Sequence, residues 1–196
     1  MPHNWPTGRR SPETRLTHDD MNAAPASLRD RLRQDTAEAH KSLDAMLDTY
    51  DLRRADGLGR FLQVNERGFA ALAGTQAASA RVAADLSRRM RTDLAVLGRL
   101  PLPRAAPLRD SLSALAIDYV VYGSRLGARI QQRQWASATD PLVRRATQTF
   151  GTEPEIDAWK RFCDQAGGMP AAGATADRAI DDSRLIFGLF IEGAYF

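Results

Sequence analysis

Apolar side chains recur at every third or fourth position along most of this chain, which is the spacing of one face of an α-helix. Residues 28–47 show the pattern clearly, with Leu28, Leu32, Leu43 and Leu47 on one face. No segment of useful length alternates apolar and polar residues, as a half-buried β-strand does. The sequence therefore predicts an all-α, single-domain protein in which about seven helices pack as a bundle-like globule.

The predicted helices are separated by loops and by one proline-rich break. Three prolines within residues 98–107 cannot remain in a helix, so this stretch interrupts the helical pattern. Helices are predicted at residues 28–47, 56–74, 82–97, 108–133, from 141 onward, 153–166 and from 175 onward. In the longest of them, the stripe expected to face the core consists of Leu112, Leu115, Tyr119, Leu126 and Ile130.

The composition excludes several classes of protein. The chain has 196 residues, 43% of them hydrophobic, which suits one domain with a real core. No apolar run approaches the roughly 18 residues of a membrane span, so we expect no membrane association. The formal charge of +3 is too small to favour nucleic-acid binding. A single cysteine, Cys163, excludes an internal disulfide and a cysteine-cluster metal site, and it indicates a reducing, cytoplasmic location.

The first part of the chain differs from the rest in composition. Residues 1–25 contain no apolar segment of the kind that a secretory signal needs. We predict a disordered N-terminal extension at residues 1–25, which includes the alternatives of a tag or of sequence upstream of a start at Met21. Residues 26–196 are predicted to form the folded domain.

His40 is the only histidine of the predicted domain, because His3 and His18 lie in the extension. Its spacing from Leu32 and Leu43 places it on the apolar face of its helix, toward the core. One interpretation is a buried neutral imidazole that is hydrogen-bonded to a main-chain carbonyl. The other is an axial ligand of haem iron, since one helical histidine is a common haem ligand. A zinc or di-iron site that needs several histidines is excluded.

Two glycines lie four residues apart in the longest predicted helix. Gly123 and Gly127 each cost about 1 kcal/mol relative to alanine in a helix interior, so a close neighbour is expected on their face. A neighbouring helix that crosses closely is one candidate. A flat cofactor that lies against bare backbone is the other.

Together these stretches resemble the haem oxygenase family. "LRQDTAEAHKSLD" resembles its proximal-helix motif, L-R-x-x-T-x-x-x-H-x-x-L-D, and "YVVYGSRLGA" resembles the distal-helix motif of its bacterial branch, Y-V-x-E-G-S-x-L-G. The likeness is closest to the enzymes that supply biliverdin to bacterial phytochromes. It covers the chain from about Leu28 to the C-terminus, and outside the two motifs it rests on the helix pattern alone.

The resemblance implies a helical fold in which haem lies between a proximal and a distal helix. His40 would be the proximal iron ligand, with haem as both substrate and cofactor. Gly123 and Gly127 would let the distal helix bend over the porphyrin, and Ser124 would stand where animal enzymes carry an aspartate that orders water. We expect these three distal residues to serve catalysis.

Further residues are implied to contact haem. Arg33 would lie near the haem propionates, and the hydroxyl of Tyr119 would reach a propionate or a water. Arg178 and Arg184 are additional candidates for the propionates, with solvated surface positions as their alternative. One departure stands out, because Tyr122 replaces the glutamate of the bacterial motif and removes a charge.

The resemblance implies an enzyme that cleaves haem to biliverdin, carbon monoxide and ferrous iron with oxygen and external electrons. Only two of the 27 basic residues are lysines, Lys41 and Lys160, so the chain is rich in arginine. An arginine-rich surface would suit an acidic, ferredoxin-like electron donor. A bacteriophytochrome is the expected acceptor of biliverdin. Two alternatives stay open: a haem-binding or haem-sensing protein without turnover, which Tyr122 would favour, and a cofactor-free helical interaction module.

Overall fold

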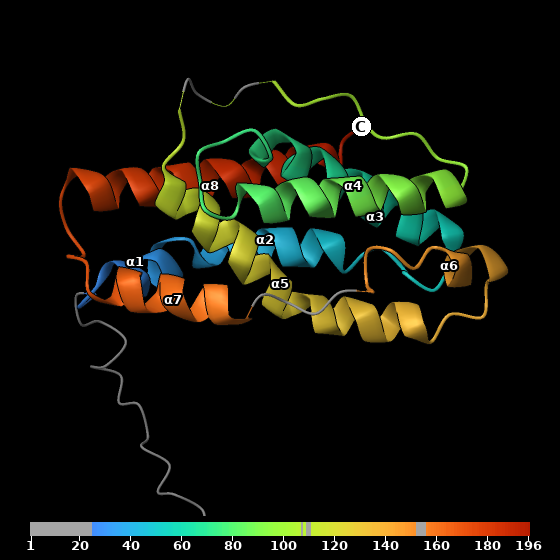
Figure 1. Ribbon diagram of the computed structural model, residues 1–196, viewed down its shortest axis with the longest axis horizontal. Helices are drawn as coiled ribbons and strands as arrows, with labels where there is room; N and C mark the ends of the chain where they lie inside the picture. Colours follow the sequence, from blue (N-terminus) through green and yellow to red (C-terminus); the bar gives the residue numbers. More distant parts are fainter. Residues whose placement is uncertain (1–24, 107, 109–110, 152–155) are drawn as a thin grey trace, which may run out of the picture.

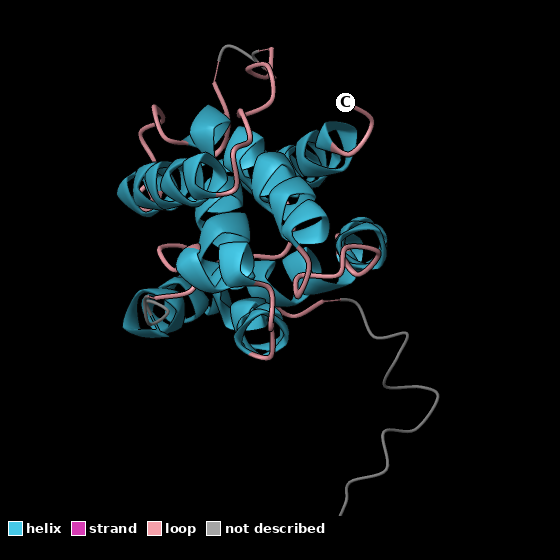
Figure 2. Cartoon of the chain, turned by 90° about the vertical axis from the view of Figure 1, so that its right-hand side faces the viewer, coloured by secondary structure: helices cyan, strands magenta, loops and turns pink. Residues whose placement is uncertain are grey.

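The computed structural model describes residues 25–106, 108, 111–151 and 156–196, and these residues form helices and loops without any strand (Figure 2). The all-α prediction is therefore confirmed for this part of the chain. The predicted extension at residues 1–25 lies, apart from Pro25, outside the described residues. The helices are α1 (Leu28–Asp35), α2 (Ala37–Leu47), α3 (Ala55–Leu72), α4 (Ala80–Val96), α5 (Ala114–Ala136), α6 (Pro141–Arg145), α7 (Ile156–Gly167) and α8 (Ala174–Gly193).

The helices pack around two groups of buried apolar side chains. α3 and α4 lie side by side, and α8 packs against α2, α3 and α5 (Figure 1). The larger group fills the space among α3, α4, α5 and α8, and the smaller group joins α1, α7 and α8. Tyr119 of α5 contacts both groups, so α5 connects the two parts of the core. No helix of the described residues is long and apolar enough to cross a membrane.

The first predicted helix is in fact two helices. The sequence predicts one helix over residues 28–47, but α1 ends at Asp35 and α2 begins at Ala37. Between them Thr36 is fully buried, with φ −105° and ψ 0°, and its hydroxyl donates to the carbonyl of Leu32 at 2.6 Å. A threonine that bonds back to the carbonyl four residues earlier bends a helix, which explains the break.

The longest helix differs from its prediction in both start and register. α5 begins at Ala114 rather than near residue 108. The carboxylate of Asp182 accepts the backbone N–H of Ser113 at 2.7 Å and so holds the preceding segment against α8. Ile117, Val120 and Val121 are the large apolar side chains that α5 buries.

The predicted core stripe of this helix is correct only in its first part. Leu112, Leu115 and Tyr119 are partly buried against the core, whereas Leu126 is 41% exposed and Ile130 is 70% exposed. Two adjacent faces of α5 carry apolar residues at helical spacing, so periodicity did not identify which one the other helices cover.

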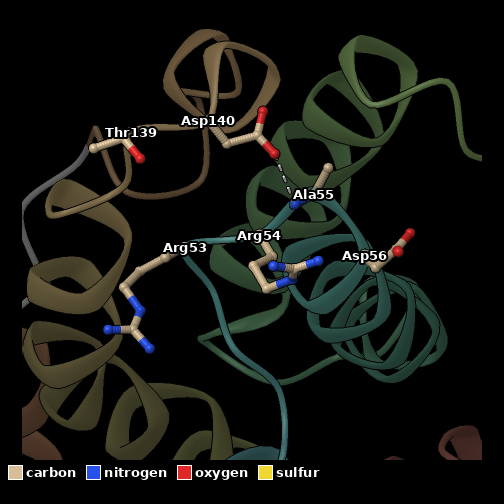
Figure 3. A pocket seen from close by; sticks show the side chains of 6 residues that line it. All are labelled: Arg53, Arg54, Ala55, Asp56, Thr139 and Asp140. Carbon is tan, nitrogen blue, oxygen red and sulfur yellow. Dashed lines mark hydrogen bonds between the residues drawn. The ribbon is translucent and has the colours of Figure 1, made fainter.

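Two carboxylates, from Asp93 and Asp140, fix loops to the helices. Asp93 of α4 is 1% exposed and accepts the backbone N–H groups of Gln148 and Thr149 at 3.0 and 2.7 Å. Asp140 accepts the N–H of Ala55 at the start of α3 at 3.3 Å, and Figure 3 shows this bond. These bonds hold the chain on either side of α6 against α3 and α4, where it forms one wall of the cavity described next.

Candidate functional site

A cavity of about 510 Å³ lies among α2, α3, α4, α5, α7 and α8 and the segment 149–150. This volume is within the usual range of small-molecule sites. Aromatic rings form much of its wall: Phe61, Phe69, Phe150, Trp159, Phe187 and Phe190. The cavity brings together most of the site residues that the sequence predicts, from both motifs: His40, Tyr119, Gly123, Ser124 and Gly127.

His40 lines the cavity from α2 but is not a core residue. Its side chain is 53% exposed, and its ring meets Phe187 edge to face with the centroids 5.5 Å apart. The interpretation as a buried histidine bonded to a carbonyl is therefore wrong. Because the helix restarts after Thr36, Leu43 is the one residue of α2 that is buried.

The two ring nitrogens of His40 have different surroundings. Nδ1 lies 3.0 Å from Oδ2 of Asp44, one turn along α2. No group in the described part of the chain forms a hydrogen bond with Nε2. A carboxylate beside Nδ1 favours the tautomer with the proton on that nitrogen, which leaves the lone pair of Nε2 for a metal. Asp44 was missed as a site residue, although its position four residues after His40 is the signal that identifies such a partner.

The two glycines of α5 differ in their surroundings, because Gly127 faces open space and Gly123 faces a side chain of α7. A Cβ atom on Gly127 would have no neighbour within 4 Å among the described residues, and one on Gly123 would meet only the ring of Trp159, at 3.6 Å. The interpretation of Gly127 as a close helix-crossing position is therefore wrong. Both glycines line the cavity and leave its wall free of side chains at these points.

Tyr119 and Ser124 are the hydroxyl side chains of α5 that line the cavity, and both have their protons engaged within the protein. Ser124 donates to the carbonyl of Val121 at 2.8 Å. The hydroxyl of Thr36 already donates its proton to the carbonyl of Leu32. In the 3.3 Å contact between the hydroxyls of Tyr119 and Thr36, Tyr119 is therefore the donor. Ser124 and Tyr119 are thus left as acceptors, which suits a water molecule better than a carboxylate.

The arginines predicted to hold propionates lie elsewhere. Arg33 is exposed on α1 and does not line the cavity. Arg178 donates to the carbonyl and hydroxyl of Ser111, and Arg184 donates to the carbonyl of Asp35. Among the described residues, the arginine that lines the cavity is Arg125, which is 7% exposed and which sequence reasoning missed.

Tyr122, the departure from the bacterial motif, does not line the cavity. It packs against the smaller group of core residues, on the side of α5 that faces α7. The departure from the motif therefore lies outside the residues that line the cavity.

Other parts of the surface offer weaker candidates. A cleft of about 400 Å³ at the start of α3 is polar, and Figure 3 shows Arg53, Arg54 and Asp140 around it. The carboxylate of Asp140 already accepts the N–H of Ala55 there. Arg53 pairs with Asp51, and the hydrogen bonds from Arg53 lower the pKa of the Asp51 carboxyl. The charges of this cleft are therefore largely matched within the chain.

Alternative metal chemistry has little support in the described residues. No group of three or more histidine, cysteine, aspartate or glutamate side chains among them is arranged to hold a metal ion. Burial raises the pKa of the Cys163 thiol, so this cysteine is a poor nucleophile and a poor ligand.

A comparison with protein-family models and with curated protein sequences finds no match for this chain. The functional assignment therefore depends on the cavity and on the two sequence motifs that meet in it.

Proposed function

We propose that this protein is a haem oxygenase, which cleaves haem to biliverdin, carbon monoxide and ferrous iron with oxygen and external electrons. One observation carries the proposal. A histidine whose Nε2 is available faces the same cavity as a helix whose surface is bared by Gly123 and Gly127. A planar iron macrocycle needs both features, a nitrogen ligand on one side and a close, flat surface on the other.

The cavity residues fit such a group in shape and in polarity. The residues of α5 that contribute to the wall lie between Tyr119 and Gln131, and at 1.5 Å per residue this stretch extends about 18 Å along the helix. The exposed side chains of Leu126 and Ile130 also line the cavity. A flat apolar ligand would cover this surface, which otherwise stays in contact with water.

Each residue then has a defined task. His40 binds the iron through Nε2, and Asp44 holds the ring orientation and the Nδ1 proton. Gly123 and Gly127 allow the backbone of α5 to approach the macrocycle. Bound haem supplies the iron that reacts with oxygen and is itself the molecule oxidised.

Ser124 orders water on the open side of the site. Its proton is held by the carbonyl of Val121, so its oxygen accepts a hydrogen bond from water. A water held in this way keeps its second proton for another acceptor in the cavity. Ser124 therefore positions a proton donor without being an acid itself.

The partners follow from the same proposal. The exposed Arg129 and Arg133 on α5 lie beside cavity residues and offer positive charge to an acidic, ferredoxin-like electron donor. The biliverdin product would go to a bacteriophytochrome. A haem sensor without turnover is less well supported, because Tyr122, the feature that favoured it, does not line the cavity.

The test is turnover by the purified protein. Haemin is added first, and formation of a Soret band measures binding. Reduced ferredoxin or ascorbate is then supplied with oxygen, and we expect the Soret band to disappear while a broad red absorption of biliverdin grows. Haem that binds but survives this treatment would identify a sensor instead. Lys41→Ala is the matched control, since Lys41 is exposed on α2 next to His40 and does not line the cavity.

A further inference from the structure

A second cavity lies along α3 and α4, which run side by side (Figure 1), and is closed by the segment that follows α4. We refer to it as the outer groove. Its volume is about 820 Å³, which is within the usual range of small-molecule sites. It shares no lining residue with the cavity that His40 lines, and no part of the proposed function uses it.

The segment that closes the groove is fixed by hydrogen bonds from α3. Gln63 donates to the carbonyl of Leu100 at 2.6 Å, and Arg67 donates to the carbonyl of Pro103 at 3.3 Å. Arg67 also bonds the carbonyl of Leu189 and the carboxylate of Glu192, so its guanidinium is fully used within the protein. The outer groove therefore has a built wall on each side.

A buried carboxylate lines the groove. Glu66 is 1% exposed, and carboxylates are almost never buried to this degree unless they are paired. Its Oε1 accepts the hydroxyl of Ser87 at 2.9 Å and Nε of Arg91 at 2.6 Å. No described group donates to its Oε2. A molecule in the groove can supply the missing donor, which a buried charged oxygen needs.

The guanidinium next to this carboxylate has donors left over. Arg91 uses Nε on Glu66, and its two terminal nitrogens make no hydrogen bond with any described residue. Its side chain is 46% exposed, so a ligand can reach these nitrogens. A molecule that meets Glu66 Oε2 and Arg91 together needs an N–H donor and an anionic group close to each other. The ammonium and carboxylate of an α-amino acid, which share one carbon, meet this need.

The groove also carries positive charge that the described carboxylates do not balance. Arg88 lies one turn before Arg91, and side chains three residues apart on a helix are neighbours. Its partner Asp85 is shared with Arg89, so two guanidinium groups face one carboxylate. Arg104 lines the groove from the other side and has no hydrogen bond or ion pair with any described residue. This excess favours a ligand with a second anionic group.

We propose that the outer groove binds an acidic α-amino acid. The ammonium group donates to Glu66 Oε2, the α-carboxylate accepts from Arg91, and the side-chain carboxylate accepts from Arg88. Arg104 adds positive charge across the groove. Alanines of α3 and α4 lie along it and leave room for the aliphatic part of the ligand. The inference goes beyond the proposed function and does not depend on haem.

The test titrates three related molecules into the ¹⁵N-labelled, haem-free chain. L-glutamate carries all three groups, glutarate lacks the ammonium, and L-glutamine lacks the side-chain charge. Amide chemical shifts measure the affinity and identify the helices that respond. We expect L-glutamate to shift the signals of α3 and α4 around Glu66 and Arg91, and glutarate and L-glutamine each to bind about tenfold more weakly.

A variant of Arg88 tests the second contact without disturbing the buried pair. Arg88→Gln changes a side chain that is 63% exposed, and Asp85 keeps Arg89 as its partner. This variant should weaken L-glutamate about tenfold and leave L-glutamine nearly unchanged. The matched control is Arg81→Gln, since Arg81 is exposed on α4 and does not line the groove, and it should bind L-glutamate as the wild type does.

Three results would overturn the inference. The first is L-glutamate that shifts no signal of α3 or α4, which would mean that water alone occupies the groove. The second is glutarate that binds as tightly as L-glutamate, because Glu66 then receives no donor from the ligand. The third is equal weakening of L-glutamate by Arg88→Gln and Arg81→Gln, which would reduce the effect to general surface charge. None of these results bears on haem binding at His40.

Discussion

The two halves of α5 carry the same apolar spacing but have opposite surroundings. In the first half, Ile117, Val120 and Val121 are at most 4% exposed. In the second half, Leu126 and Ile130 are exposed, and Gly127 faces empty space. The difference comes from the neighbours, because other helices cover Ile117 and Val121, whereas Leu126, Gly127 and Ile130 border the cavity.

This contrast shows where a ligand has room to bind. An apolar side chain that is covered by other helices contributes to folding, whereas one that borders a cavity contributes only when a ligand covers it. The residues of α5 that other helices cover, such as Ile117, should therefore determine stability, and those that border the cavity, such as Gly127 and Ile130, should determine haem affinity. The following variants test that division, from the largest expected effect to the smallest.

Truncation of the same residue type in each half should have very different effects on stability. Ile117→Ala leaves a hole in a buried site that is 1% exposed, and it should lower the free energy of unfolding by about 2–5 kcal/mol. Ile130→Ala removes a side chain that is 70% exposed, and it should change that free energy by less than about 0.5 kcal/mol. Chemical denaturation measures both, and equal losses would contradict the division.

Loss of the proposed iron ligand should affect binding and spare the fold. His40→Ala should weaken haemin at least about a hundredfold, since it removes the bond to iron. The melting temperature of the haem-free protein should barely change, because the side chain is half exposed and alanine favours a helix. Unfolding of this variant would instead make His40 a structural residue. If His40 is the iron ligand, imidazole added to the variant should restore the haem spectrum.

A side chain at the second glycine should fill the site. Gly127→Leu places atoms where a Cβ has no neighbour within 4 Å, so the haem-free protein should be at least as stable as the wild type. Haemin affinity should fall about tenfold or more, because leucine occupies the space of the macrocycle. Unchanged affinity in a Soret titration would remove Gly127 from the site.

A surface ion pair away from α5 should have the smallest effect. Partial burial raises the pKa of Asp85, but hydrogen bonds from Arg89 and Arg88 outweigh it, so the pKa lies below its ordinary value of 3.8. Asp85→Asn should lower the free energy of unfolding at neutral pH by about 0.2–1 kcal/mol at most, as exposed pairs do.

The pH dependence of that small effect has a defined sign. A carboxyl with a lowered pKa stabilises the fold above its ordinary pKa and loses this contribution as the pH falls through the lowered value. The difference between Asp85→Asn and the wild type should therefore shrink on acidification. Thermal melts across the acid range check this, and a difference that grows toward low pH would contradict it. Haemin affinity should be the same in both proteins.

Helical periodicity predicted the elements of this fold well, and the places where it was wrong have physical causes. The break at Thr36 depends on one hydroxyl bond to Leu32. The start of α5 depends on a carboxylate of α8, Asp182, which is 69 positions away in the chain. Spacing alone carries no information about either contact, because the first is a bond made by one side chain to its own helix and the second is set by tertiary structure.

The sequence predicted only part of the candidate site, again because it identifies local motifs better than tertiary contacts. His40, Gly123 and Gly127 could be recognised because their motifs are local in the sequence. Arg125 was missed because its burial depends on the segments packed around the second half of α5. Arg33 was expected at the site, yet it lies on the exposed side of α1. An arginine that binds an anionic group is therefore harder to identify from sequence than a candidate iron ligand in a motif, because its role depends on where it lies in three dimensions.

The position of iron in a crystal of the haemin complex tests the central claim most directly. Anomalous diffraction at the iron edge locates the metal without reference to the protein. The account predicts one peak at bonding distance from His40 Nε2, with the backbone of Gly123 and Gly127 over the opposite face of the macrocycle. A peak away from His40, or haem bound outside the cavity between α2 and α5, would contradict it.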